Sequence, residues 1–321
     1  MKQGFVLRRL LQIVPTVMGV VLVGFLLIHI APGDPILALA GEHGDAEYYA
    51  FMRSRYGLDE PLPRQLVTYF ARVATGDFGV SHVHGRSTAR VIMERVPATL
   101  LLTGSALLMS IVISIPLGAL AARRPHSARD IGINTAALVL FSAPVFWVGQ
   151  LAIFALALKL GVFPVQGMAS AGSASTGGSH AIDVVRHLAL PAMVLASQEL
   201  AAFVRLTRSG LMDELARDHI RTARAKGVGE PWVLMRHALP RALMPVITVI
   251  GARAGQLIAG AVVVEIVFGW PGIGRLLLTS LQTRDTPLLL GLFLVISFTV
   301  TLANLVTDLL HSTVDPRVRL G

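Results

Sequence analysis

ATLLLTGSALLMSIVISIPLGALAA, residues 98–122, contains no charged side chain and decides the class of fold. About 20 consecutive apolar residues cross the hydrocarbon core of a bilayer as an α-helix, and this stretch is long enough to do so. The whole chain of 321 residues is 54% hydrophobic and only 15% charged, with a mean hydropathy of +0.66. A soluble domain is about one quarter charged. The composition therefore predicts an all-α polytopic membrane protein.

Five further apolar stretches have about the length of a spanning helix. In chain order they are Leu10–Ile30, Ile131–Leu158, Leu188–Val204, Leu243–Phe268 and Leu288–Leu310. The stretch from Ile131 carries Pro144, and the stretch from Leu188 is the shortest and contains Glu199. Together with residues 98–122, they predict six transmembrane helices.

Lysine and arginine gather in the loops that six spans would place on one side. With the N-terminus inside, the cytoplasmic segments hold sixteen basic residues, and the short outside loops after the third and fifth spans hold two each. Cytoplasmic loops of membrane proteins are enriched in Lys and Arg, so both termini are predicted inside. The same bias accounts for the formal net charge of +9 without a nucleic-acid partner. There is no cysteine, which excludes disulfides and thiol catalysis.

The predicted topology divides the chain into three parts. Residues 1–97 form a first helix and a long extracytoplasmic region, and residues 98–310 form a five-helix core. Residues 311–321 form a cytoplasmic tail.

The most informative segment runs from Arg205 to Arg241 and is called the charged loop below. It holds eight basic and four acidic residues, and its first half has a helical repeat. That repeat is Leu211, Leu215, His219 and Ala223. Lys226-Gly227 is typical of a helix end. Pro231 suits the first turn of a second short helix, which Pro240 is expected to end. Composition alone favours a solvated amphipathic hairpin on the membrane surface.

The spacing of small residues in the charged loop points elsewhere. Ala223, Gly227, Leu239 and Pro240 fit the signature of binding-protein-dependent ABC importer permeases, which this loop resembles. Arg221 and Thr222 stand where that signature has glutamate and a first alanine. This departure is similar to the dipeptide, oligopeptide and nickel permease subfamily, in particular its first, B-type subunit. The resemblance extends through Pro32-Gly33-Asp34-Pro35, Gly57-Leu58-Asp59-Glu60-Pro61, Gly76-Asp77-Phe78-Gly79, Glu265 to Arg275 and Asp315-Pro316-Arg317.

The resemblance implies a type I ABC importer permease in the bacterial inner membrane. In this family the loop forms a coupling helix that docks on an ATP-binding subunit. The residues carried over to that role are Arg221, Thr222, Ala223, Arg224, Lys226, Gly227, His237, Leu239 and Pro240. Ala223 and Gly227 are expected to leave room for close backbone approach, and Gly227 is expected to be the position least tolerant of a side chain.

The implied partners are a second homologous permease, two ABC ATPase subunits and an extracytoplasmic solute-binding protein. The chain has only three lysines, Lys2, Lys159 and Lys226, and none lies in a phosphate-binding G-x-x-x-x-G-K-[ST] motif. No cofactor is therefore expected on this chain, and ATP and Mg²⁺ are expected on the partner ATPases. The expected solute is a peptide, or a related small solute such as an opine, glutathione or a nickel chelate.

Three ionisable residues within the spans are candidates for the solute pathway. Arg253 is near the middle of the fifth span, where it could meet a carboxylate of a passing solute or be held by Glu199 of the fourth span. Glu265 lies near the outer end of the fifth span and is expected at the membrane interface. Ser110, Ser114 and Gly118 form a row of small residues that predicts a contact between spans.

Two other functions stay open at this stage. An ion-coupled secondary transporter would need no ATPase, but it would leave the charged loop without a role. No nucleophile–base set indicates an enzyme. His82 and His84, with His43, invite a metal site, but alternating histidines in an exposed loop are usually surface residues and no metal is predicted.

Overall fold

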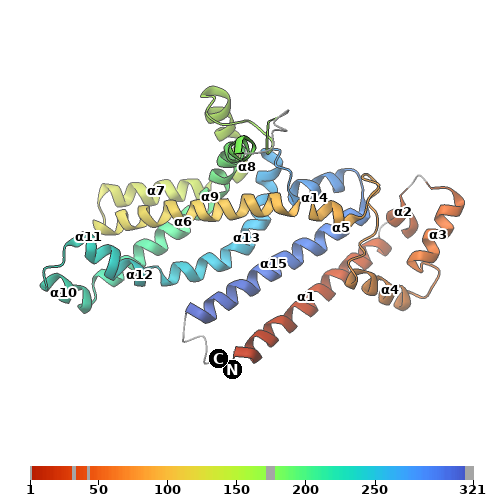
Figure 1. The fold of residues 1–321 in the computed structure, drawn as a ribbon, viewed down its shortest axis with the longest axis horizontal. Helices are drawn as coiled ribbons and strands as arrows, with labels where there is room; N and C mark the ends of the chain where they lie inside the picture. Colours follow the sequence, from red (N-terminus) through yellow and green to blue (C-terminus); the bar gives the residue numbers. More distant parts are fainter. Residues whose placement is uncertain (1, 31–33, 42–43, 171–177, 315–321) are drawn as a thin grey trace. The chain divides into compact units, whose positions relative to one another are not determined.

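The computed structural model describes residues 2–30, 34–41, 44–170 and 178–314. This part of the chain is mostly helical, and its only β pairing is an isolated bridge between Val80 and Ser87 (Figure 1). The long helices are α1 Lys2–Ile30, α6 Val96–Arg123, α7 Ala128–Ser142, α9 Gly178–Leu215, α13 Met244–Val267 and α15 Thr286–Val314. The all-α prediction is confirmed.

Length and apolarity mark several of these helices as membrane spans. Within the described residues, three helices qualify on their own: Thr88–Arg123, Ser179–Leu215 and Thr286–Ala303. A fourth span is possible as a bent pair, Ala128–Ser142 with Val145–Lys159, and Val14–Ile30 is a shorter apolar helix. Helix α13 covers the fifth predicted span and is 24 residues long. Each of the six predicted stretches thus coincides with helix.

The third predicted span is not the continuous helix that its composition suggested. Helix α7 ends at Ser142, and α8 (Val145–Ala152) and the π-helical η1 (Ile153–Lys159) follow after a bend of 104°. Pro144 causes the break: proline disfavours helical geometry in the residue before it, and Ala143 is extended, with ψ at 136°. The third predicted span is therefore a helix broken at Pro144.

The fourth predicted span is longer than expected. Leu188–Val204 forms the middle of α9, which has 38 residues and continues to Leu215. Helix α9 therefore carries the first eleven residues of the charged loop, from Arg205 to Leu215, as a direct extension of the predicted span.

The chain forms two compact units. One contains residues 1–99 and 271–305, and the other contains residues 100–270 and 306–321. The first unit includes the short helices of the predicted extracytoplasmic region and one that follows Trp270. These are α2 Pro35–Ala40, α3 Ala46–Tyr56, α4 Leu62–Ala74, α5 Thr88–Met93 and α14 Ile273–Gln282.

A fully buried carboxylate ties the first unit together. Asp285, between α14 and α15, accepts a hydrogen bond of 2.5 Å from the Ser81 hydroxyl. The backbone amides of Val83 and Leu288 also donate to it, each at 3.3 Å. Because a buried carboxylate needs such partners, the loop around Ser81 is fixed to the start of α15.

The Gly76-Asp77-Phe78-Gly79 motif has a structural role in the same unit. Asp77 accepts hydrogen bonds from the Gly79 amide at 3.0 Å and from Arg72 at 2.9 and 3.1 Å, and Arg55 lies 3.7 Å away. Burial raises the pKa of Asp77, but the Gly79 amide, Arg72 and Arg55 together outweigh burial and hold that pKa below its ordinary value. The motif therefore closes the end of α4 onto the following loop.

In the second unit, α6 and α9 pack closely at Gly118. A Cβ atom at Gly118 would lie 2.6 Å from the Thr207 Cβ and 2.8 Å from the Val204 carbonyl oxygen. Ser110 and Ser114 are both fully buried on the same row of α6. The predicted contact between spans is confirmed at Gly118, where the absence of a side chain permits the approach.

We expect Gly118→Val to destabilise the protein by about 1–3 kcal/mol, because the added carbons meet backbone that cannot rotate away. The thermal unfolding midpoint of the detergent-purified protein measures this. Gly104→Val on the same helix is the matched control, because a Cβ there meets no atom within 4 Å. Equal midpoints for the two variants would contradict the packing argument.

Candidate functional site

The charged loop folds as three successive helical segments. Helix α9 ends at Leu215, α10 (Asp218–Ala225) follows, and α11 (Glu230–Trp232) continues through the π-helical η2 (Val233–Ala238) into α12 (Leu239–Ala242). The predicted single helix through Leu211 and Ala223 is wrong, because Arg217 is extended, with φ −76° and ψ 153°. The break separates α10 from α9 as a short helix of its own.

Pro240 was expected to end the second helix, but the helical path continues past it. It lies in the first turn of α12, where proline is tolerated because the first-turn amides have no partner within an α-helix. The helical path continues to Ala242, and α13 begins at Met244. Pro240 is exposed, whereas His237 and Leu239 are partly buried.

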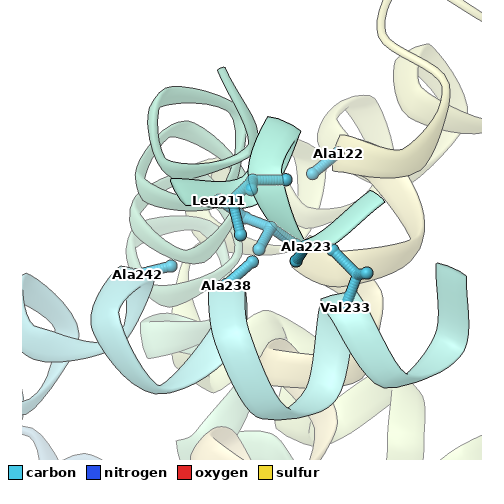
Figure 2. Close-up of a cluster of buried hydrophobic side chains, with 7 residues drawn as sticks. Ala122, Leu211, Ala223, Val233, Ala238 and Ala242 are labelled. Atoms are coloured by element: carbon cyan, nitrogen blue, oxygen red, sulfur yellow. The ribbon is translucent and has the colours of Figure 1, made fainter. Parts of the chain in front are cut away.

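A cluster of buried apolar side chains holds these segments on α9 and α6. Its members are Ala122, Leu211, Ile220, Ala223, Val233, Ala238 and Ala242. Figure 2 shows these side chains converging from separate helical segments. Burying a Leu, Ile or Val side chain contributes about 1.5–3 kcal/mol, so the cluster fixes α10 against its own chain.

Ala223 belongs to this cluster and is only 8% exposed. Its side chain therefore faces α9 and η2 of its own chain. With Ile220 it forms the inward face of α10, and that face leaves the other side of the helix free for contact.

The outward face of α10 is basic. Arg221, Thr222, Arg224 and Lys226 are exposed. Two of the cations have acidic neighbours: Arg221 lies 3.4 Å from Asp218, and Arg224 Nε lies 2.6 Å from Glu230. Such exposed pairs contribute little to stability, so both arginines can exchange these partners for others.

The backbone conformation at position 227 favours glycine. Its φ is +79°, a left-handed value that L side chains rarely adopt. The Val228 amide donates to the Ala223 carbonyl at 3.2 Å and closes the end of α10. A Cβ at Gly227 would meet no atom of the described chain within 4 Å, unlike one at Gly118 or Gly210.

A buried acid that the sequence reading missed holds the start of α7. Asp130 is 3% exposed, and its carboxylate accepts hydrogen bonds from Arg208 Nε at 2.6 Å and from Arg208 Nη2 at 2.7 Å. The His126 amide donates to it at 2.8 Å, and the Asn134 side chain at 2.7 Å. Ser127, three residues earlier, caps the helix. This S-x-x-D capping pattern was the available sequence signal.

Of the three pathway candidates, Arg253 and Glu199 lie together and Glu265 lies apart from them. Arg253 Nε on α13 lies 3.7 Å from Glu199 Oε2 on α9, and the Glu199 side chain is only 8% exposed. The structure thus brings Arg253 and Glu199 together. Glu265 is fully buried and lies in the last turn of α13, two residues before its end at Val267. The chain turns back at Gly269, where the Trp270 amide donates to the Glu265 carbonyl at 2.8 Å and covers this end of α13.

His82 and His84 lie in the loop that Ser81 fixes to Asp285. His84 Nδ1 is 3.0 Å from the Ser81 hydroxyl, which is the same hydroxyl that donates to Asp285. His43 lies outside the described residues. No group of three His, Cys, Asp or Glu side chains in the described part of the chain could hold a metal ion.

Family models cover almost the whole chain. Residues 114–320 match the model of the binding-protein-dependent transport system inner membrane component, and residues 2–103 match the model of the N-terminal region of such components. The chain belongs to this family. It is a multi-pass inner-membrane permease subunit of an ABC importer, and the ion-coupled alternative is excluded.

Two relatives match this permease over nearly their full length. The oligopeptide transport system permease protein AppB of Bacillus subtilis (strain 168) is 38% identical over 317 residues, covering 98% of this chain and 99% of the relative. The dipeptide transport system permease protein DppB of Escherichia coli (strain K12) is 38% identical over 333 residues, covering 98% of each chain. The permease is a transport subunit and not an enzyme, and separate subunits hydrolyse the ATP.

A solved transporter supports the fold of the permease. An inward-facing structure of the MetNI methionine ABC transporter aligns with a TM-score of 0.55 at 16% identity, covering 70% of this chain and 96% of that chain. At this identity the likeness concerns the fold alone, which is that of a type I ABC permease.

We expect Asp130→Asn to lower the thermal unfolding midpoint of the purified permease by about 5 °C, because Arg208 loses its charged partner in a closely packed site. Asp218→Asn is the matched control, because the Asp218 side chain is 95% exposed beside Arg221. It should leave the midpoint unchanged. An unchanged midpoint in Asp130→Asn would show that this pair does not hold α7 to α9.

Proposed function

We propose that this permease moves peptides, or a related small solute, inward by alternating access, and that α10 couples this movement to ATP hydrolysis on a partner subunit. The observation that carries the proposal is the two-sided character of α10. Ile220 and Ala223 anchor one face to the chain's own core, while the other face exposes basic side chains. A short, well-anchored helix with a free face suits the transmission of movement between subunits.

The proposed coupling site comprises α10 and the return segment of the charged loop. Arg221, Thr222, Arg224 and Lys226 supply the face of α10 that would contact an acidic rim on the ATPase, and Gly227 gives the backbone turn behind it. Ala223 anchors the helix from inside. His237, Leu239 and Pro240 lie in the return segment, which leads through Ala242 to α13.

The proposed topology has six spans with both termini in the cytoplasm. Each of the six predicted stretches contains helix, which supports the number of spans. In this topology α7, α8 and η1 together form the third span. The excess of Lys and Arg in the segments assigned to the cytoplasm supports the orientation. Residues 1–97 then form the first helix and the extracytoplasmic region, residues 98–310 the core and residues 311–321 the tail.

The proposed assembly contains a second homologous permease, two ATPase subunits that bind ATP and Mg²⁺, and an extracytoplasmic solute-binding protein. The long region before α6 and the turn after α13 would face that binding protein. Di- or oligopeptides are the first candidate solutes, because AppB and DppB are named for them. Opines, glutathione and nickel chelates follow. Arg253, Glu199 and Glu265 would lie near the pathway.

Co-purification tests the assembly. The tagged permease is extracted from its native membrane, and the accompanying proteins are identified and quantified by mass spectrometry. We expect an ATPase and a second permease in stoichiometric yield, and the binding protein encoded with them can then be screened against peptides. A chain that emerges alone, and that moves solute in liposomes without ATP, would overturn the proposal.

Gly227→Asp should abolish transport while the permease is still made, because a side chain is strained at a φ of +79° and lies behind the coupling face. Gly229→Asp is the matched control. It adds the same charge two residues away, at a helix N-cap with φ −64° where aspartate is favoured. Solute uptake into vesicles measures both. Normal uptake by Gly227→Asp would remove Gly227 from the coupling site.

A further inference from the structure

A buried carboxylate sits where the charged loop leaves α9. Glu214 lies in the last turn of α9, and its side chain is only 7% exposed. Arg217 Nε lies 3.0 Å from its Oε2, and His219 Nε2 lies 3.1 Å from its Oε1. Arg241 Nη1 lies 3.7 Å from the same Oε1. Arg217 and His219 belong to the start of α10 and Arg241 to α12. One acid therefore contacts both the start of α10 and α12.

Gly210 permits this arrangement. A Cβ at Gly210 would lie 2.7 Å from the Ala242 carbonyl oxygen, so α12 crosses α9 closely at that point. Side chains four residues apart share one face of a helix, which places Glu214 beside Gly210. Arg241 precedes Ala242 and so comes within reach of the carboxylate. The contact between Glu214 and Arg241 follows from this crossing.

The other ion pairs within α10 and α11 are exposed. In the Asp218–Arg221 pair the two side chains are 95% and 74% exposed, and in the Glu230–Arg224 pair they are 61% and 42% exposed. Exposed pairs hold geometry weakly, whereas a buried acid that loses its cations is strongly unfavourable. Glu214 therefore restricts the placement of α10 and α12 more than those two pairs do.

The Glu214 contacts are not saturated. Oε1 is buried and accepts no hydrogen bond, although His219 and Arg241 approach it. His219 Nε2 is also buried and makes no hydrogen bond. A buried acceptor without a donor is unfavourable, and His219 at 3.1 Å and Arg241 at 3.7 Å are the cations nearest to it. A displacement of α10 or α12 therefore changes the contacts of this carboxylate.

We propose that Glu214 is a positioning residue that links α10 to α12, so that displacement of α10 by an ATPase moves α12 and the start of α13. This inference rests on the proposed function, in which α10 meets the ATPase. Discrete arrangements of a buried polar cluster convert small displacements into a shift between states. Glu214 acts through Arg241 and needs no contact with solute or nucleotide.

The test uses the assembled importer, reconstituted in liposomes with its binding protein and a dipeptide. ATP hydrolysis and peptide uptake are measured in the same vesicles, and their ratio is compared between wild type and Glu214→Gln. We expect about tenfold less peptide moved per ATP, with normal amounts of ATPase in the complex. Asp213→Asn, which changes the exposed neighbouring acid, should keep the wild-type ratio.

Arg241→Gln gives a second arm that does not depend on the buried position, because the Arg241 side chain is 62% exposed. It should also lower the ratio, and the double variant should match Glu214→Gln alone, since the two residues act as one unit. Arg236→Gln is its control, because Arg236 lies over Trp232 and has no part in the cluster.

The outcomes distinguish failure of the Glu214 role from failure of the proposed function. A wild-type ratio in Glu214→Gln, or additive losses in the double variant, would overturn the positioning role. If Glu214→Gln fails to assemble, a wild-type ratio in Arg241→Gln would overturn it equally. If the wild-type complex takes up peptide without ATP, the proposed function itself fails.

Discussion

The absence of water in the bilayer core is the constraint on which this structure depends. Backbone N–H and C=O groups in hydrocarbon must find partners within the protein, and a helix satisfies them within one segment. The same constraint acts on polar side chains. Glu199, at 8% exposure, lies in a helix and has a basic group beside it. A carboxylate in such surroundings persists only with compensating partners. The contact between such a carboxylate and its partner therefore fixes the two elements that carry them relative to each other.

The charged loop extends this logic beyond the spans. Its small residues serve two different purposes. Ala223, Ala238 and Ala242 are buried against α9 and α6, where larger side chains would separate the helices. Gly227 instead supplies a left-handed turn in open space. The basic residues that remain outside carry the face available to a partner. An inward apolar face and an outward basic face together fit α10 to the coupling role proposed for it.

Breaks in the helices have identifiable causes and place side chains that a straight helix would misdirect. Pro144 lies at a bend of 104° between α7 and α8, and the extended Arg217 turns α10 away from α9. Beyond this second break, Arg217 and His219 reach back to Glu214. A continuous helix through this region would direct α10 along the axis of α9 and carry His219, five residues after Glu214, to another face of the helix.

The sequence by itself determined the class of fold, the positions of the long helices and the family. Those depend on local hydrophobicity, on composition and on the spacing of Ala223, Gly227, Leu239 and Pro240, all of which are visible along the chain. The pairing of Arg253 with Glu199 was one of two alternatives that the sequence allowed. Only the tertiary structure decided that Ala223 faces inward, that Glu265 is buried and that Asp130 and Glu214 are clamped by arginines. These outcomes depend on which helices cross and at what distance. A crossing that leaves no space for a Cβ at Gly210, or a partner 78 residues away for Asp130, leaves no periodic trace in the sequence.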